Sequence, residues 1–430
     1  MSTPLKVAIA GLGTVGVGTI ELLSAQSELL TVRCGRSIEV VAVSAQDRAK
    51  NRGVDLSGIT WFDDPVAMAR DADTDVFVEL IGGSEGIAKE ACEAAINAGR
   101  HVVTANKALI ALYGTELALS AEQYGVALAY EAAVAGGIPI IKSLREGLAG
   151  NRIESLHGIL NGTCNYILTT MRETGRAFAG VLSDAQELGY AEADPSFDID
   201  GVDAAHKLAI LTSVAFGTEV DFGGIHVEGI RHIAAEDIEY AGEFGYRIKL
   251  LGISERTEYG IQQRVHPAMV PEGAPIAGVE GVFNAVVTEG DFVGTSVLEG
   301  RGAGAGPTAS AVVGDIADLA CQRIIKTFGI PASDLSRSLP ADFDHHVGAY
   351  YIRLMVDDQP GVFAEIAAEL ATHEISIEGV IQRSRSETEA VPVVMTTHDT
   401  TEAAIQDVLA AFAKLNAVRE PPRMIRIEKF

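Results

Sequence analysis

The chain has 430 residues, which predicts two to four domains at about 150 residues per domain. Its 33 Lys and Arg residues against 59 Asp and Glu residues give a formal net charge of −26 at pH 7. Such an acidic surface repels phosphate backbones and anionic lipid headgroups, so nucleic acids and membranes are not expected partners. Hydrophobic residues make up 47% of the chain, enough to form a sizeable core.

The cysteines give no sign of a disulfide framework or a structural zinc site. They are widely spread and form no Cys-x-x-Cys pair: Cys34, Cys92, Cys164 and Cys321. The sequence also shows no secretory leader and no apolar stretch of about twenty residues. These features predict a reduced, soluble, cytoplasmic protein.

The N-terminal part alternates apolar strands with helical segments. Helices are expected at about 85–98 and 106–124, between strands at Leu5–Ala10, Ile38–Ser44, Asp75–Leu80, His101–Thr104 and Val126–Tyr130. Strands that are apolar along their whole length are typical of a parallel sheet covered on both faces. We therefore predict an α/β, doubly wound, Rossmann-type domain over residues 1–130.

The pattern changes after Glu131. Residues 131–305 mix strands with helices at about 139–148 and 202–216, which predicts an α+β domain that carries catalysis and dimerisation. A helix over 308–328 is expected to return to the first domain. Residues 329–347 are expected to form a linker, and 348–430 show the order β-α-β-β-α-β, which is typical of a ferredoxin-like domain.

A glycine-rich turn follows the first strand and opens a helix. Its glycines are Gly11, Gly13 and Gly16, with Thr14 and Val15 between them. Such glycines let the backbone approach a pyrophosphate, and the helix N-terminus supplies free N–H groups. A lone motif of this kind is weak, but its place between strand and helix predicts dinucleotide binding.

The residues that end the second strand bear on the choice of dinucleotide. An acidic residue there would bind the ribose 2′-hydroxyl of NAD, but this chain has Ser44 and then two basic residues, Arg48 and Lys50. Small and basic residues favour the 2′-phosphate of NADP, with Arg48 as a candidate contact. Asp47 leaves NAD open, and the basic residues could simply be solvated.

Two further segments carry candidate chemistry. Thr104 and Lys107 lie where a parallel strand ends, and Lys107 could anchor a carboxylate, hold a cofactor phosphate or assist proton transfer. Asp203 and Lys207 are four residues apart on one helix face. They could form a solvated ion pair or handle a proton, whereas an EF-hand is excluded because Lys207 stands where a bidentate Glu is required.

The segment from Ala185 to Lys207 closely resembles the signature of homoserine dehydrogenases. The glycine turn, residues 104–107, residues 131–138 and the motif NGTCNY are similar to the same family. The C-terminal domain, with its turn Asp358-x-Pro360-Gly361-Val362, resembles an ACT domain. The resemblance implies NAD(P)-dependent interconversion of L-homoserine and L-aspartate 4-semialdehyde, a step toward threonine, methionine and isoleucine.

That resemblance also implies roles for individual residues. Lys207 would give and take the proton, with Asp203 orienting it and Lys107 near the reacting oxygen. Glu192 would hold the substrate amine. A monovalent cation, usually sodium, would be bound by Glu131 and by the carbonyls of Val134, Gly136 and Ile138. Gly302 would approach the cofactor. Tight turns in a hinge loop would explain the presence of Gly302 and of the glycines in residues 131–138 equally well.

The residues also allow interpretations outside this family's chemistry. Cys164 could be a nucleophile, but a small buried thiol is what we expect. A ligand-sensing protein built on a degenerate dehydrogenase is a second possibility, which loss of Lys107, Asp203 or Lys207 would favour, but all three are present. An oxidoreductase for another small substrate is a further possibility. By analogy with the family, we expect L-threonine as effector and a homodimer or homotetramer.

Overall fold

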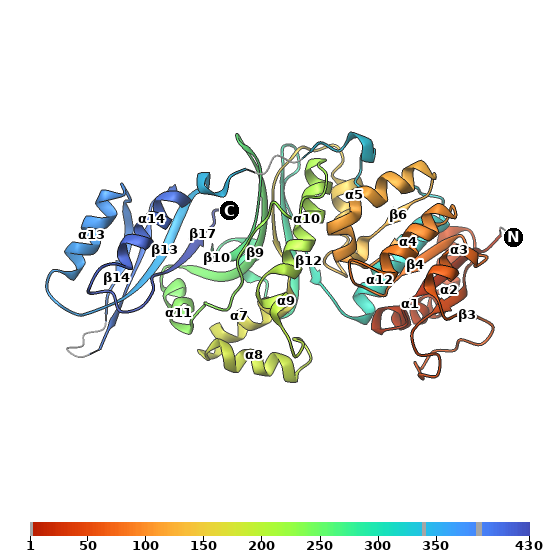
Figure 1. Cartoon of the computed structure of the whole chain (residues 1–430), viewed down its shortest axis with the longest axis horizontal. Helices are drawn as coiled ribbons and strands as arrows, with labels where there is room; N and C mark the ends of the chain where they lie inside the picture. The colour runs from red at the N-terminus through yellow and green to blue at the C-terminus, as the bar shows by residue number, and fades with distance from the viewer. Residues whose placement is uncertain (1–2, 338–340, 384–388) are drawn as a thin grey trace.

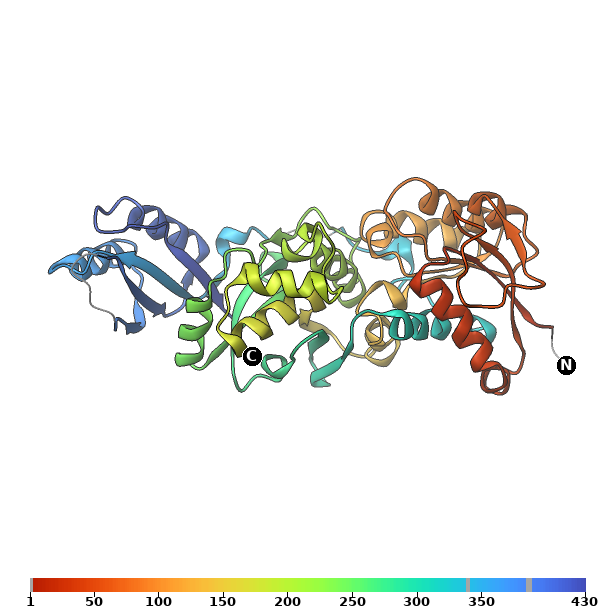
Figure 2. The ribbon, with the colours of Figure 1, turned by 90° about the horizontal axis from the view of Figure 1, so that it is seen from below.

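The computed structural model describes residues 3–337, 341–383 and 389–430. The molecule is elongated, with the N-terminal domain at one end, the C-terminal domain at the other, and a middle domain between them (Figures 1 and 2). Part of the predicted linker, residues 338–340, lies outside the described residues. Among the helices that the structure describes, none is both long and apolar enough to cross a membrane.

The N-terminal domain has the predicted parallel sheet, with strand order β3-β2-β1-β4-β5-β6. Its strands are β1 (Leu5–Ala10), β2 (Ile38–Ser44), β3 (Thr60–Phe62), β4 (Val76–Glu79), β5 (His101–Thr104) and β6 (Leu128–Ala129). This order is that of the Rossmann fold, in which ligands bind at the carboxyl ends of the strands. The predicted Rossmann-type domain is confirmed.

Helices cover both faces of this sheet. One face packs on α1 (Thr14–Ala25), α2 (Ser27–Cys34) and α12 (Ala305–Ala320), and the other on α3 (Pro65–Asp71), α4 (Ile87–Asn97) and α5 (Lys107–Gln123). The central strands β1, β4 and β5 are almost entirely buried, which explains why they are so apolar, whereas β3 at the edge is more exposed.

The returning helix differs from its prediction. It was expected over 308–328, but α12 ends at Ala320. Gln322 takes a left-handed conformation with φ of 59°, and the Arg323 N–H donates to the Asp318 carbonyl, which is the hydrogen bond of a Schellman end. Because glutamine holds the position that glycine usually takes, no sequence signal marked this stop.

The middle domain contributes five strands to one large mixed sheet. They are β7 (Ile153–Ile159), β9 (Tyr246–Thr257), β10 (Gly260–Pro271), β11 (Phe283–Gly290) and β12 (Gly294–Arg301), with the short β8 (His226–Val227) beside β10. The helices are α7 (Gly162–Thr174), α8 (Phe178–Glu187), α9 (Ser196–Ile199), α10 (Val202–Phe216) and α11 (Ala235–Glu243). The helix expected over 139–148 is a short α6 (Ile140–Lys142) continued by a π-helical turn.

The C-terminal domain has the predicted β-α-β-β-α-β order. Its elements are β13 (Val347–Val356), α13 (Val362–Thr372), β14 (Ile377–Ile381), β15 (Val391–Thr397), the two-residue β16 (Thr400–Thr401), α14 (Glu402–Phe412) and β17 (Arg423–Ile427). The sequence did not predict that β17 pairs in parallel with β10, which joins both domains in one 11-stranded sheet.

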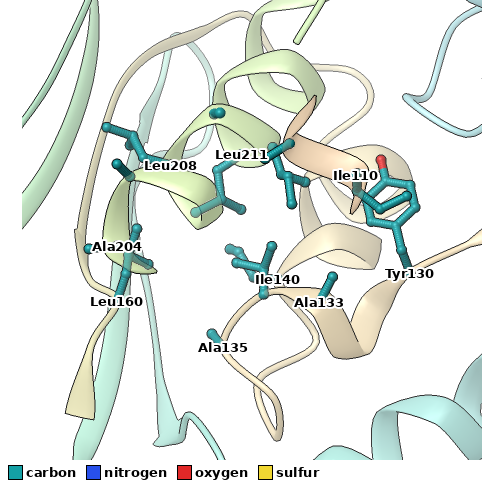
Figure 3. Packing of buried hydrophobic residues seen from close by; sticks show 14 of the residues in the cluster. Ile110, Tyr130, Ala133, Ala135, Ile140, Leu160, Ala204, Leu208 and Leu211 are labelled. Carbon is teal, nitrogen blue, oxygen red and sulfur yellow. The ribbon is translucent and has the colours of Figure 1, made fainter. Parts of the chain in front are cut away.

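A hydrophobic core joins the first two domains directly behind the carboxyl edge of the Rossmann sheet. Ile110 of α5, Ile140 of α6 and Leu211 of α10 are fully buried and point toward one another (Figure 3). Tyr130 closes this core, and its hydroxyl donates to the Thr327 carbonyl at 2.8 Å. The packing fixes α5 and α10 side by side, although they belong to different domains.

Candidate active site

The glycine turn after β1 is sterically specified. Gly11 has a φ of +97°, and a Cβ there would lie 2.3 Å from the Leu80 carbonyl oxygen. A Cβ on Gly16 would lie 2.0 Å from the Gly11 oxygen. Gly13 caps α1, so the first-turn N–H groups of Thr14 and Val15 lie at the mouth of the turn. Gly11 and Gly16 therefore leave no room for a side chain at this junction, whereas a Cβ on Gly13 would meet no neighbour within 4 Å.

A cavity of about 570 Å³ opens at this turn. Gly11 and Gly13 line it together with residues that follow β2 and β4. The cavity lies at the carboxyl ends of the strands, at the point where the strand order reverses, which is where doubly wound sheets bind ligands. The free N–H groups and the dipole at the N-terminus of α1 attract an anion. These features suit the pyrophosphate of a dinucleotide.

The end of β2 places basic side chains at the same cavity. Lys50 and Arg52 line it, and the Arg52 Nε donates to the Leu12 carbonyl at 3.3 Å. Arg48 is exposed, with its guanidinium 5.8 Å from the centre of the Trp61 ring. The sequence prediction named Arg48 and missed Arg52, which contacts the glycine turn only through tertiary structure.

Thr104, predicted to contact the cofactor, is fully buried at the end of β5. Its hydroxyl donates to Glu79 Oε2 at 2.6 Å. The other oxygen of Glu79 accepts the N–H groups of Ile81 at 2.7 Å and Gly82 at 2.9 Å. Thr104 thus supports the loop after β4, and its direct contact with a cofactor stays a prediction.

The three residues predicted to carry the chemistry meet in one cluster. Lys107 opens α5, and Asp203 and Lys207 lie on the first turns of α10. Asp203 Oδ1 is 2.9 Å from Lys107 Nζ, and its Oδ2 is 2.7 Å from Lys207 Nζ. Two ammonium groups from two domains therefore share a single buried carboxylate.

Burial and mutual attraction compete in this cluster. Burial by itself would raise the pKa of Asp203, but the charges of Lys207 and Lys107 outweigh it and hold the pKa well below its usual range. Burial lowers the pKa of Lys107, yet Asp203 outweighs it and leaves the pKa above its ordinary value. For the fully buried Lys207, burial prevails and the pKa falls below the usual 10.5.

Asn161 organises the cluster, and no role had been predicted for it within the NGTCNY motif. Its amide nitrogen donates to Asp203 Oδ2 and Asp198 Oδ1, both at 2.8 Å, while its oxygen caps α7. The preceding carbonyl, that of Leu160, accepts a hydrogen bond from Lys207 Nζ at 2.7 Å. The junction of β7 and α7 thus fixes both Asp203 and Lys207.

Glu192 lies in the loop before α9 and is exposed. Its negative charge is the smallest of those that help to raise the pKa of Lys107. The Lys107 ammonium also lies 5.6 Å from the centre of the exposed Phe197 ring. The mouth of the cluster therefore presents an acidic, a basic and an aromatic group to a small ligand.

Cys164 is a buried thiol next to the cluster. Its Sγ donates to the Asp198 carbonyl at 3.3 Å, and burial raises its pKa well above the usual value. His157, seven residues earlier in the sequence, lies on β7 and contacts the ring of Phe430. A nucleophilic cysteine needs a lowered pKa, so the structure supports the expected packing role.

The residues predicted to bind a cation lie where the first two domains join. Glu131 is buried, and its carboxylate oxygens accept the N–H groups of Ile141 and Lys142, both at 2.9 Å. Burial and the neighbouring Asp315 raise its pKa to about 7. The turn at Ala135 and Gly136, with φ of 53° and 32°, lies between the predicted carbonyl ligands of Val134 and Ile138.

Gly302 packs against this turn. A Cβ on Gly302 would lie 1.8 Å from Asn284 Oδ1, and one on Gly136 would lie 2.6 Å from the Gly302 oxygen. Close packing therefore accounts for both glycines. The approach of Gly302 to the cofactor stays a prediction.

Models of known protein families match most of the chain. The homoserine dehydrogenase model matches residues 139–317, the homoserine dehydrogenase NAD-binding domain residues 11–131, and the ACT domain residues 350–417. The homoserine dehydrogenase of Neisseria gonorrhoeae is 46% identical over 432 residues, and that of Pseudomonas aeruginosa 45% over 441, each alignment covering 99% of both chains.

Solved structures agree with these matches. A homoserine dehydrogenase from Thiobacillus denitrificans superposes with a TM-score of 0.93 at 45% identity, covering 99% of each chain. A hyperthermophilic archaeal homoserine dehydrogenase in complex with NADPH gives a TM-score of 0.63 at 27% identity, covering 74% of this chain and 97% of that one. The chain belongs to the homoserine dehydrogenases, NAD(P)-dependent oxidoreductases, and carries a C-terminal ACT domain.

Proposed function

We propose that Lys107, Asp203 and Lys207 form the catalytic centre for the interconversion of L-homoserine and L-aspartate 4-semialdehyde. The observation that carries this proposal is the convergence of two lysines from two domains on one buried carboxylate. This cluster lies beyond the carboxyl ends of the Rossmann strands, where a dehydrogenase needs its substrate. In the cell, the reaction would serve the synthesis of threonine, methionine and isoleucine.

Lys207 is the proposed general acid and base. Oxidation of the primary alcohol requires the hydroxyl proton to leave as hydride departs from the same carbon. A bound nicotinamide supplies the hydride acceptor. The lowered pKa of Lys207 increases the fraction of free amine that can take the proton. In the reverse direction, the Lys207 ammonium returns that proton to the aldehyde oxygen.

The remaining groups bind the substrate or orient Lys207. Asp203 fixes the Lys207 side chain by their 2.7 Å contact. Lys107, on the other side of that carboxylate, stabilises negative charge on the reacting oxygen. Glu192 binds the substrate ammonium from the exposed loop. These assignments predict a substrate that carries a hydroxyl and an amine, which fits homoserine.

The proposed cofactor is NADP(H), with NAD(H) as a second possibility. Lys50 and Arg52 line the cavity at the end of β2, and Arg48 lies exposed next to them. Together they suit a ribose 2′-phosphate, whereas Asp47 in the same lining disfavours it. Arg52 is the basic side chain tied to the glycine turn, so we assign it the main contact.

The homoserine assay tests the function and the cofactor preference together. L-homoserine with NADP⁺ should generate reduced cofactor, and Arg52→Ala should raise the KM for NADP⁺ about tenfold, roughly the loss of one charge-assisted hydrogen bond. The KM for NAD⁺ should change little. Arg33→Ala, at the exposed end of α2, is the matched control. Absence of turnover with either cofactor would refute the function, and an equal effect on both would remove Arg52 from recognition of the 2′-phosphate.

A monovalent cation, sodium by our proposal, fits the junction at Glu131. Each Glu131 oxygen uses one lone pair on a backbone N–H and keeps another. Backbone carbonyls of Val134, Gly136 and Ile138 would complete a set of hard oxygen ligands, the donors that such a cation prefers. The bound ion would offset the buried charge of Glu131 and Asp315 and hold the two domains in register.

The ACT domain is the proposed sensor for an amino-acid effector, which we propose to be L-threonine. L-threonine added to the full-length enzyme should lower the initial rate of homoserine oxidation, and D-threonine should not. An unchanged rate would refute threonine as effector. Removing the domain is an unsuitable control, because β17 supplies ladder hydrogen bonds to β10 of the middle domain.

We also propose that the enzyme forms a homodimer or homotetramer. The expectation rests on the family and on the tendency of such domains to pair. Light scattering on the full-length protein measures the mass directly. A monomeric mass at assay concentration would refute it.

A further inference from the structure

Two cysteines with no role in the proposed chemistry lie side by side on the Rossmann domain. Cys34 is the last residue of α2, and Cys321 follows the last residue of α12. Cys34 Sγ donates to the Ala317 carbonyl of α12 at 3.7 Å, and Cys321 Sγ donates to the Arg33 carbonyl of α2 at 3.8 Å. Each thiol thus rests on the helix that carries the other one.

These crossed hydrogen bonds bring the two thiols together at the ends of the two helices. Both are partly exposed, whereas Cys92 and Cys164 are fully buried. A small oxidant in solvent can therefore reach this pair and not the other two. Two adjacent, accessible thiols can form a disulfide when oxidised, which a single buried cysteine cannot do.

We propose that Cys34 and Cys321 are an oxidation site that closes to an intramolecular disulfide with hydrogen peroxide. A thiolate attacks one peroxide oxygen, the O–O bond breaks, and the hydroxide that leaves takes up a proton to give water. The second sulfur attacks the resulting sulfenic acid and displaces a second water. Two thiols are oxidised by two electrons, and one peroxide is reduced to two waters.

The surroundings of Cys34 disfavour its thiolate form. Burial and the neighbouring Cys321 raise the pKa of Cys34 to about 11, so Cys34 is a poor thiolate at neutral pH. The charged groups that act on the pair are Asp318, of α12, and Arg323, whose guanidinium lies 3.3 Å from the Asp318 carboxylate. We therefore expect slow oxidation at neutral pH and faster oxidation in alkaline buffer.

The disulfide would tie the returning helix to the start of the Rossmann domain. α12 packs on α1 and α2, but the chain leaves this domain after β6 and re-enters it only with α12. Cys321 lies at the end of this 16-residue helix remote from Gly302, about 24 Å along its axis. The bond should stabilise the domain by restricting its unfolded chain, and leave kcat unchanged.

The test uses the full-length enzyme, first reduced and then treated with hydrogen peroxide. We expect two of the four thiols to be lost, a peptide that links residues 34 and 321 in a non-reducing digest, and full recovery with dithiothreitol. We also expect the Tm to rise by roughly 3 °C or more, as for a cross-link that closes a long loop in a large domain.

Variants that lack one of the two cysteines test whether the effect of peroxide depends on this pair. Cys34→Ser and Cys321→Ser should each give no linked peptide and no rise in Tm on treatment with peroxide. The proposal is overturned if the four thiols survive peroxide treatment, or if the linked peptide is absent. A disulfide between two chains, seen as a non-reducing dimer, would overturn it equally.

Discussion

Replacement of Lys207 by methionine is expected to lower kcat for homoserine oxidation by about 10³-fold, within the range for loss of a general acid and base. Methionine keeps much of the side-chain volume but removes the group that exchanges the proton. The dissociation constant for NADPH, measured by fluorescence titration, should stay near that of the wild type. The loss is therefore expected in kcat and not in cofactor affinity.

Lys249→Met is the matched control. Lys249 is also a buried lysine, 2% exposed, but it bonds the Val279 carbonyl and lies away from the Lys207 cluster. This variant should keep kcat even where it lowers stability. Activity like that of the wild type in Lys207→Met would remove Lys207 from the mechanism, and equal losses in both variants would point to a structural cause.

The role assigned to Lys207 also predicts how kcat changes with pH in each direction of the reaction. Oxidation of homoserine needs the free amine of Lys207, so its kcat should rise with pH through the pKa of that group, which burial places below 10.5. Reduction of the semialdehyde needs the ammonium, so its kcat should fall over the same range. Profiles that run in the same direction would contradict Lys207 as the shared acid and base.

Substitution of Glu428 by glutamine is expected to destabilise the enzyme by about 3 kcal/mol, the lower end of the range for a broken buried ion pair. Glu428 Oε2 lies 2.9 Å from Arg264 Nη2, and Arg264 is 1% exposed. Glu428 directly follows β17 and Arg264 lies on β10, so the pair links the C-terminal and middle domains. Arg264 keeps its contact with Glu255 at 2.6 Å, which limits the loss.

Urea unfolding measures this prediction, and the exposed pair Lys429–Asp399 supplies the control. Asp399→Asn should cost less than about 1 kcal/mol, as is usual for surface ion pairs. Burial alone would raise the pKa of Glu428, but Arg264 and His266 outweigh it and hold the pKa well below 4.5. The stabilisation is therefore present above the unfolded pKa and is lost as pH falls through the folded one. Equal effects of the two variants would contradict a special role for the buried pair.

The sequence predicts those features of the site that depend on neighbouring residues. Gly11 and Gly16 are needed by the local turn, and Asp203 and Lys207 share a face because they are four residues apart on one helix. The alternation of strands and helices predicts the Rossmann sheet for the same local reason. These features were confirmed by the structure.

Features that depend on distant contacts could not be predicted from pattern alone. Lys107 reaches Asp203 only because α5 packs beside α10, and Asn161 acts on Asp203 across 42 residues. Arg52 contacts the glycine turn from a loop with no distinct motif. The pairing of β17 with β10 likewise joins residues that no local pattern connects.

The central claim is that this chain moves a hydride between the carbinol carbon of homoserine and a nicotinamide cofactor. L-homoserine with two deuterium atoms on that carbon should transfer one of them to NADP⁺, so that mass spectrometry finds singly deuterated NADPH. Lys207→Met should give almost none in the same time. Unlabelled reduced cofactor, or none at all from the wild-type enzyme with either NADP⁺ or NAD⁺, would contradict the account.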